Sequence, residues 1–174
     1  ESNTTLGYNF FGISTVLADL QGHGEEQLNQ EQVDKLNKLL EENDFDPELI
    51  LDANSKFVVG YVESMKEHPD SDHLHITKVK VDNDQELQCG APNIDEGQKV
   101  VVAKVGAMMP NGAMIFPGKL RGVESMGMIC SARELELPNA PQKRGILVLP
   151  ETDTFEVGKE FNFVKGAELF TNKA

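Results

Sequence analysis

The sequence predicts an α+β fold, in which a small N-terminal α/β domain precedes a small β-barrel. Two observations predict it. Apolar residues recur at helical spacing within the first 55 residues, and short β-branched and aromatic runs separated by turn residues follow from Phe57 onward. We place the N-terminal domain at residues 1–55, the barrel at residues 56–163 and a C-terminal tail at residues 164–174. The predicted linker is Ala53-Asn54-Ser55.

The N-terminal domain is predicted from one well-marked helix and weaker segments around it. Asn29 precedes the helix as an N-cap with Gln32 at the N3 position, and Asn43 is placed to end it. Its apolar stripe, which we expect to face a core, consists of Val33, Leu36, Leu39 and Leu40. Weaker patterns predict the end of a strand or hairpin in residues 1–12, a short helix at 15–20 capped by Ser14, and a turn or short helix from Asp46-Pro47.

Short strands are predicted throughout the second domain. They are expected at residues 57–62, 74–81, 87–89, 99–105, 145–150 and 157–161. Turn residues such as Asp82-Asn83-Asp84 and Pro110-Asn111-Gly112 separate them. Five or so short strands closing into a small barrel fit an OB-fold, although their spacing alone also allows another small β-barrel.

The charge of the chain is unevenly distributed. A formal net charge of −13 is unfavourable for general nucleic-acid binding, which depends on Lys and Arg contacts to phosphates. Residues 1–56 hold 3 basic and 12 acidic residues, whereas residues 97–133 hold five basic residues and one acidic residue. The five are Lys99, Lys104, Lys119, Arg121 and Arg133. Any anion binding on this locally positive face is expected to be weak, sensitive to salt and dependent on shape.

Composition also indicates the cellular compartment of the protein. Two cysteines, Cys89 and Cys130, do not suggest a disulfide framework, and we expect reduced, packed thiols. No apolar run approaches the length of a bilayer span, and nothing near the start resembles a signal peptide. We therefore expect a soluble, cytoplasmic protein with no membrane partner. Because the sequence begins with Glu1 and not Met, we also expect that some N-terminal sequence is missing.

The segment from Gly122 to Leu135 has the composition of a surface. Two glycines, two serines and two methionines in its first ten residues make a poor core strand and a poor helix. Ser131 is placed to cap a helical-looking run, with Glu134 three residues later as in a capping box. The free N–H groups of such a helix start suit a phosphate.

Three motifs in this order carry a resemblance to a known family. They are His68-Pro69-Asp70-Ser71-Asp72-His73-Leu74, Cys89-Gly90-Ala91-Pro92-Asn93 and the run from Lys119 to Met128, Lys-Leu-Arg-Gly-Val-Glu-Ser-Met-Gly-Met. Together they resemble the tRNA-binding module of endothelial monocyte-activating polypeptide II and of the N-terminal part of the bacterial phenylalanyl-tRNA synthetase beta subunit. The architecture is most similar to bacterial stand-alone tRNA-binding proteins with a small N-terminal domain. The resemblance covers roughly residues 57–163, well over half of the chain.

The resemblance implies a non-catalytic, cytoplasmic translation protein, similar to the phenylalanyl-tRNA synthetase beta module, that recognises tRNA by shape and phosphate backbone through an OB-fold. It implies no cofactor, with an aminoacyl-tRNA synthetase and a second copy of the chain as further candidate partners. The expected tRNA-binding residues are Lys78, Lys80, Asn93, Lys99, Lys104, Lys119, Arg121, Ser125, Met128, Ser131 and Arg133. Lys119 and Arg121 would contact phosphates, and the serines would bond the RNA backbone or sugar hydroxyls. The alternative is that the glycines, Met128 and Ser131 only shape and cap the barrel.

Two other functions remain open at this point. The first is a protein-interaction or oligomerisation module that has lost most RNA affinity, with an adaptable apolar patch of Met108, Met109, Met114, Met126 and Met128. The second is a metal site formed by His68, Asp70, His73 and His75, although a turn before a strand explains the same residues. The family usually has Lys where this chain has His73, which implies weaker RNA binding there near neutral pH. No residue pattern activates Cys89 as a nucleophile.

Overall fold

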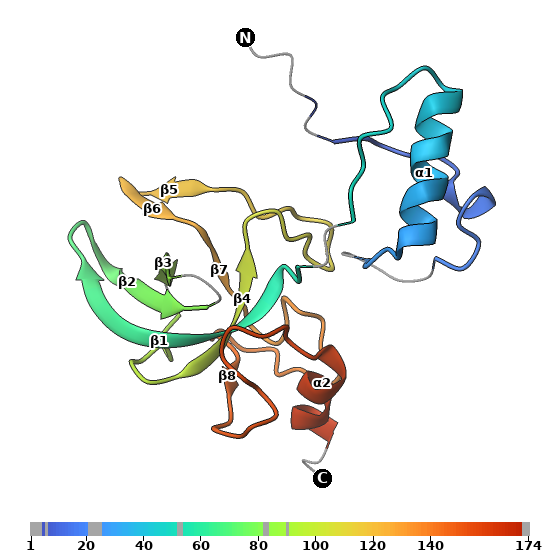
Figure 1. The fold of residues 1–174 in the computed structure, drawn as a ribbon. Helices are drawn as coiled ribbons and strands as arrows, with labels where there is room; N and C mark the ends of the chain where they lie inside the picture. Colours follow the sequence, from blue (N-terminus) through green and yellow to red (C-terminus); the bar gives the residue numbers. More distant parts are fainter. Residues whose placement is uncertain are drawn as a thin grey trace. The chain divides into compact units, whose positions relative to one another are not determined.

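The computed structural model describes residues 5, 7–20, 26–51, 54–81, 84–89 and 91–171. The chain divides into two compact units, Glu1–Ala53 and Asn54–Ala174, each described by itself below (Figure 1). Helices and antiparallel sheets occur together in the chain, so the predicted α+β class is confirmed. Neither α-helix in the described ranges has the length and apolar character needed to cross a bilayer.

The first unit is built on helix α1, Gln30–Glu42. The predicted capping box is confirmed, because Asn29 Oδ1 accepts from the Gln32 N–H and the Asn29 N–H donates to Gln32 Oε1, each at 2.9 Å. Asn43 is the C-cap, as predicted. The face that is buried consists of Gln32, Val33, Leu36 and Leu40, while Leu39 is only partly buried.

Two of the three weaker N-terminal predictions are wrong where the structure describes them. A single 3-10 turn, η1 (Ile13–Thr15), replaces the helix expected at 15–20, because Gly12 starts the turn in a left-handed conformation and Thr15 Oγ1 donates back to the Gly12 carbonyl at 2.9 Å. No strand occurs among described residues 7–12, while residues 1–4 and 6 lie outside the description. At Asp46-Pro47 the predicted turn is present and the helix is not, because the Glu48 N–H donates to the Asp46 carbonyl at 2.9 Å and Asn37 bonds both the N–H and the carbonyl of Leu49.

The second unit contains a six-stranded antiparallel sheet. Its strand order is β3-β2-β1-β4-β7, with β8 paired to β4, and a separate hairpin joins β5 to β6. The strands are β1 (Phe57–His68), β2 (Ser71–Lys80), β3 (Asp84–Cys89), β4 (Lys99–Lys104), β5 (Gly118–Leu120), β6 (Val123–Ser125), β7 (Gly127–Ile129) and β8 (Val148–Leu149).

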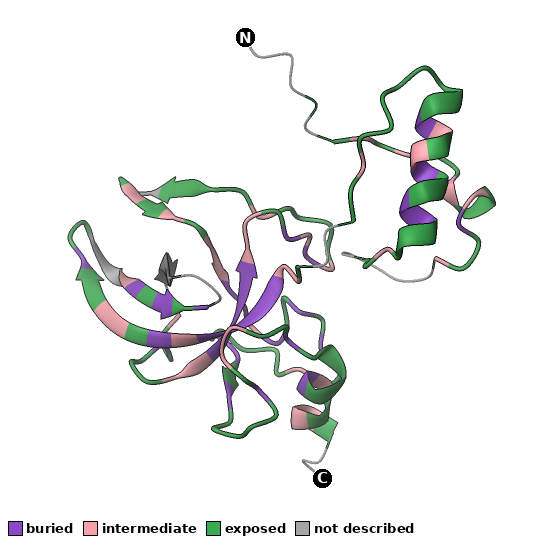
Figure 2. Ribbon diagram, in the orientation of Figure 1, coloured by how far each residue is buried: buried purple, intermediate pink, exposed green. Residues whose placement is uncertain are grey.

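Strand β1 is longer than predicted and bends sharply (Figure 1). Its register against β2 shifts between Val62 and Ser64, which is a β-bulge, and its polar second half continues pairing up to His68. In its first half, alternate residues enter two different apolar clusters: Val59 joins one and Val58 and Val62 join the other. Figure 2 shows this half of β1 and strand β4 as buried. The sheet therefore carries core on both faces here.

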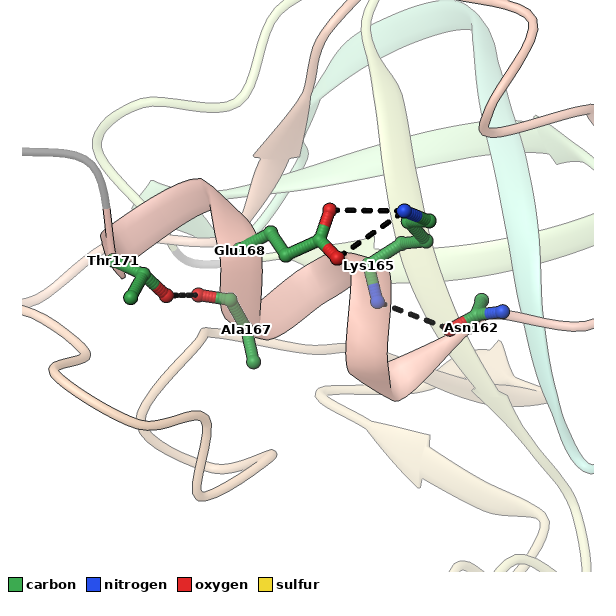
Figure 3. Close-up of polar contacts among 5 residues, drawn as sticks. All are labelled: Asn162, Lys165, Ala167, Glu168 and Thr171. Atoms are coloured by element: carbon green, nitrogen blue, oxygen red, sulfur yellow. Dashed lines mark hydrogen bonds and ion pairs between the residues drawn. The ribbon is translucent and has the colours of Figure 1, made fainter.

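A second helix, α2 (Phe163–Thr171), covers the first of these clusters, in the region expected to be a tail. Phe163 packs edge-on against Phe57 and Phe161, with ring centroids 5.4 and 5.1 Å apart. Figure 3 shows how its ends are held: Asn162 Oδ1 accepts from the Lys165 N–H at 3.0 Å, and Thr171 Oγ1 donates to the Ala167 carbonyl at 2.9 Å. The Lys165 ammonium lies 3.0 Å from Glu168 Oε2 on the exposed side of the helix.

The last two predicted strands are largely replaced by irregular chain. Only Val148–Leu149 of residues 145–150 forms a strand, and residues 157–161 form one bridge, Val58 with Glu160. The chain nevertheless runs along β1, since the Val59 N–H donates to the Lys159 carbonyl at 2.8 Å. Strand β3 lies beside β6 and β7, but the hydrogen-bonded sheet does not close in the described chain. A closed OB-fold barrel therefore stays a prediction.

Candidate nucleic-acid interface

The motif from Lys119 to Met128 forms the β5–β6 hairpin and then β7. Its two-residue turn is Arg121-Gly122, whose φ angles are 47° and 84°. A two-residue hairpin turn with two positive φ angles favours glycine, and Arg121 adopts this conformation at a cost. The Arg121 guanidinium donates from Nη1 to the Asp70 carbonyl, in the turn between β1 and β2. This arginine therefore connects the tips of two hairpins, and its exposed side chain lies at the surface.

Lys119 lies opposite Glu124 in the β5–β6 pair. Its ammonium is 3.5 Å from Glu124 Oε1, and the two side chains are 67% and 68% exposed. Its positive charge is thus partly balanced by a neighbouring carboxylate. An exposed ion pair of this kind contributes little to stability, so a phosphate can compete for the lysine at low cost.

The other predicted lysines are dispersed over β2 and β4. Lys78 pairs with Glu63 at 3.2 Å, and Lys99 lies 3.6 Å from Glu151 Oε2 and donates to the Thr152 carbonyl. Lys80 is exposed at the end of β2, and Lys104 is partly buried at the end of β4. These four lysines lie on β2 and β4, whereas Lys119 and Arg121 lie in the β5–β6 hairpin.

Asn93 connects two loops that are distant in the sequence. Its side chain donates to the Ile146 carbonyl at 3.0 Å and accepts from the Ile146 N–H at 2.9 Å. Gly145 allows this approach, because a Cβ there would stand 2.8 Å from Asn93 Oδ1. The amide of Asn93 is therefore occupied in holding residues 145–147 against the loop that follows β3.

Ser131 and Glu134 make the predicted capping-box bonds without a helix. Glu134 Oε2 accepts from the Ser131 N–H at 2.8 Å and from its hydroxyl at 2.7 Å, and the Glu134 N–H donates to Ser131 Oγ at 3.1 Å. The expected helix is instead a run of turns over residues 132–136, which ends at Glu136 with a φ of 49°. The helix N-terminus expected to suit a phosphate is therefore absent at this position. Ser125 Oγ donates to the Gly127 carbonyl at 3.3 Å.

A groove lies where the loop after β3 and the loop before β8 meet β7. Its volume is about 360 Å³, and its apolar lining includes Pro92, Met128 and Ile146. Ser131, Arg133 and Glu134 line it from the turns after β7, and Lys143 and Arg144 line it from the loop before β8. The structure thus brings together the predicted residues Met128, Ser131 and Arg133.

Lys143 and Arg144 were not among the residues predicted from the sequence. They lie outside the three family motifs, in the loop Pro138-Asn139-Ala140-Pro141-Gln142 that continues through them to Gly145. A basic pair in a loop rich in proline and asparagine is the signal that could have found them. Their approach to the groove depends on the Asn93–Ile146 bonds, which join residues 53 positions apart.

Metal binding and cysteine chemistry find little support in the described part of the chain. The His68 ring is buried and its Nδ1 accepts from the Asp70 N–H at 3.1 Å, as in the turn alternative. No group of three or more potential metal ligands is present among the described residues, and the side chain of His73 lies outside them. Burial raises the pKa of the Cys130 thiol to about 12, so this buried group is no nucleophile. The side chain of Cys89 is outside the description.

Comparison with protein families agrees with the sheet unit and its motifs. Residues 57–159 match the family model described as "Putative tRNA binding domain". Because this match covers more than half of the chain, the protein belongs to the tRNA-binding-domain family. Residues 1–52 match a second model, a domain of unknown function (DUF4479).

Individual relatives point in the same direction. "Putative tRNA-binding protein YtpR" of Bacillus subtilis (strain 168) is 49% identical over 164 residues, covering 94% of this chain and 80% of that protein. The phenylalanine–tRNA ligase beta subunit of Oceanobacillus iheyensis is 48% identical over 118 residues, which are 65% of this chain but only 14% of that subunit. The family and the Bacillus relative are named for binding tRNA and not for a reaction, in agreement with a non-catalytic protein.

Among solved structures, a MetRS-related protein from Pyrococcus horikoshii aligns over 59% of this chain and 84% of that chain. The identity is 24% and the TM-score is 0.43, a likeness too low to carry a conclusion.

Proposed function

We propose that this chain is a non-catalytic tRNA-binding protein that recognises the shape and phosphate backbone of tRNA. The observation that carries the proposal is the match of residues 57–159 to the tRNA-binding-domain family, which includes all three motifs noted in the sequence. The high identity to a bacterial protein named for tRNA binding supports it. The phosphate contacts would come from the basic residues predicted from the sequence, above all Lys119, Arg121 and Arg133.

The proposal extends to the fold and the organisation of the chain. The sheet unit would be an OB-fold barrel, a type that binds oligonucleotides, and the placement of β3 beside β6 and β7 supports near-closure. The units Glu1–Ala53 and Asn54–Ala174 would be separate domains, close to the predicted boundary. The protein would act in the cytoplasm, where tRNA is used, with an aminoacyl-tRNA synthetase as a candidate partner.

A titration with total tRNA tests this function. Filter binding or mobility shift at low and moderate salt, with double-stranded RNA as the control, measures affinity and selectivity. We expect saturable binding that prefers tRNA and weakens as salt rises, because phosphate contacts release counterions. Absence of tRNA binding at low salt would contradict the proposal.

A protein-interaction or self-association surface is the second candidate. The observation that favours it is exposed apolar side chains on either side of the β5–β6 hairpin: Phe116 is 70% exposed, Met114 44% and Met126 41%. Exposed apolar side chains suit contact with a second copy of the chain or with another protein, although Met109 of the predicted methionine patch is buried in the core. Molar mass measured by light scattering across protein concentrations tests it, and a mass that stays monomeric at all concentrations would contradict self-association.

A further inference from the structure

The groove beside Met128 combines two kinds of surface. One part is apolar, with Pro92, Met128 and Ile146, and the other is basic, with Arg133, Lys143 and Arg144. Its volume of about 360 Å³ falls within the range of ordinary small-ligand sites. A groove of this size takes one small group, such as a single base with its sugar, and is too small for a double helix. Its two surfaces require a ligand that is flat and apolar on one side and anionic on the other.

The basic side chains of the groove differ from three of the lysines predicted to contact tRNA. Lys78, Lys99 and Lys119 each lie within 4 Å of a glutamate carboxylate. Within the described residues, no hydrogen bond or ion pair engages the side chains of Arg133, Lys143 or Arg144. Positive charge without an acidic partner is notable in a chain of net charge −13. Guanidinium groups in this state are suited to bind phosphate oxygens in a bidentate manner.

Glu134 adds a hydrogen-bond acceptor to the groove. Its carboxylate lines the groove and accepts two hydrogen bonds from Ser131 through Oε2. A carboxylate has capacity for further donors, such as the 2′-hydroxyl of a ribose or an exocyclic amino group of a base. It also disfavours a second anion next to itself, so the phosphate is expected on the side of Lys143 and Arg144.

From this composition we infer that the groove binds one unpaired nucleotide of RNA. The base lies against Pro92, Met128 and Ile146, and the phosphate is bound by Arg133, Lys143 and Arg144. Unstacked bases in loops and ends of folded RNA are accessible to such a site, whereas bases within a duplex are not. This inference rests on the proposed function, and it adds a subsite that lies outside the β5–β6 hairpin.

The first test removes the charge of the basic loop. The variant Lys143→Gln/Arg144→Gln is compared with Lys66→Gln/Lys159→Gln, which removes the same charge at two exposed positions outside the groove. We expect the groove variant to bind tRNA at least about tenfold more weakly than the wild type, and the control variant to lose much less, because two phosphate contacts are lost only in the first. Equal affinities of the two variants would overturn the inference.

The second test asks whether a base enters the groove. With methyl-labelled methionine, the Met128 methyl resonance is assigned through a Met128→Leu variant and followed during titration with a single-stranded RNA hexamer. We expect a ring-current shift of Met128 but none of the exposed Met114, and no shift of Met128 with the same sequence as a duplex. A Met128 that does not respond to the hexamer, or that responds equally to polyglutamate, would overturn the inference.

The two proposals fail in different ways. If the wild-type protein does not bind tRNA at low salt, the proposed function fails, and the subsite for RNA fails with it. If the wild type binds tRNA but the groove variant binds as well as its control, only the groove assignment fails. The hairpin residues Lys119 and Arg121 would then remain as the phosphate-binding face.

Discussion

Gly60 shows how a single residue determines the packing of the sheet. It lies in β1 and faces the apolar cluster that contains Val58 and Val62, where a Cβ would stand 2.6 Å from Val79 Cγ1 and 2.9 Å from Val102 Cγ2. Both valines are fully buried and have restricted χ1 rotamers, so neither can move aside without disturbing its neighbours.

We predict that Gly60→Ala destabilises the sheet unit by about 1–3 kcal/mol, because the added methyl group overpacks the core. Urea unfolding measures this change. Gly118→Ala is the control, since nothing lies within 4 Å of its Cβ position, and it is expected to change stability by less than about 0.5 kcal/mol. Equal stability of the two variants would mean that the core rearranges around Gly60 to accommodate the added methyl group without cost.

Cys130 gives a second prediction at this scale. The thiol is fully buried and its pKa is raised to about 12, so in the folded protein it is neither accessible nor ionised at mildly alkaline pH. In a Cys89→Ser variant, which leaves Cys130 as the only cysteine of the sequence, we expect no reaction with Ellman's reagent until denaturant is added. Rapid labelling of the folded variant would contradict the burial of this side chain.

At the scale of elements, α1 and α2 differ in what stabilises them. Helix α1 has a complete capping box in its own sequence, from Asn29 to Gln32. Helix α2 has nine residues, a length at which an isolated helix is marginal in water. Its stability depends on packing. Gly166 faces Phe161, whose ring would clash with an added Cβ, and Leu169 and Phe170 pack on the core.

We predict that Asn29→Ala lowers the stability of the N-terminal unit by about 1 kcal/mol, because the Gln32 N–H loses its acceptor at the helix start. Thermal unfolding followed by helical circular dichroism measures the loss. Lys38→Ala is a suitable control, since its ion pair with Glu42 is long, at 3.8 Å, and exposed. If the two variants unfold at the same temperature, the capping box does not stabilise α1.

The β5–β6 hairpin and the groove are separate elements that carry different parts of the predicted site. The hairpin presents Lys119 and Arg121, and the groove collects Met128, Ser131 and Arg133 with the unpredicted Lys143 and Arg144. Asn93, predicted from the sequence to contact RNA, has its amide engaged with the Ile146 backbone. Its role as an RNA contact stays a prediction, while its bonds give it a part in positioning the groove.

For the whole molecule, the central question is how a chain of net charge −13 binds an anion. At long range the net charge repels an anion, so binding must rest on a few local contacts, and these are screened by salt. Most of the net negative charge lies in the first 56 residues, which hold 12 acidic residues against 3 basic ones, so the sheet unit is less unfavourable for anion binding than the whole chain.

We predict that Lys119→Ala/Arg121→Ala weakens tRNA binding and flattens its salt dependence, with little loss of fold. If each residue contacts one phosphate, the slope of log K against log salt falls by about 1.4–1.8, since each contact contributes roughly 0.7–0.9. Filter binding over a salt series measures the slope. Lys35→Ala/Lys38→Ala on α1 removes the same charge and is expected to leave the slope unchanged, so an equal response of both variants would exclude the hairpin as the RNA face.

The sequence by itself determined the features that depend on neighbouring residues: the capped helix α1, the approximate positions of β2 and β4, the second half of β3, and the family motifs. Their physical causes are local, in cap hydrogen bonds, alternation and turn chemistry. Only the tertiary structure decided the second half of β1, the docking of α2 and the joining of Pro92, Met128, Lys143 and Arg144 around one groove. These features depend on contacts between residues far apart in the chain, such as the bonds of Asn93 to Ile146, and no local pattern encodes such partners.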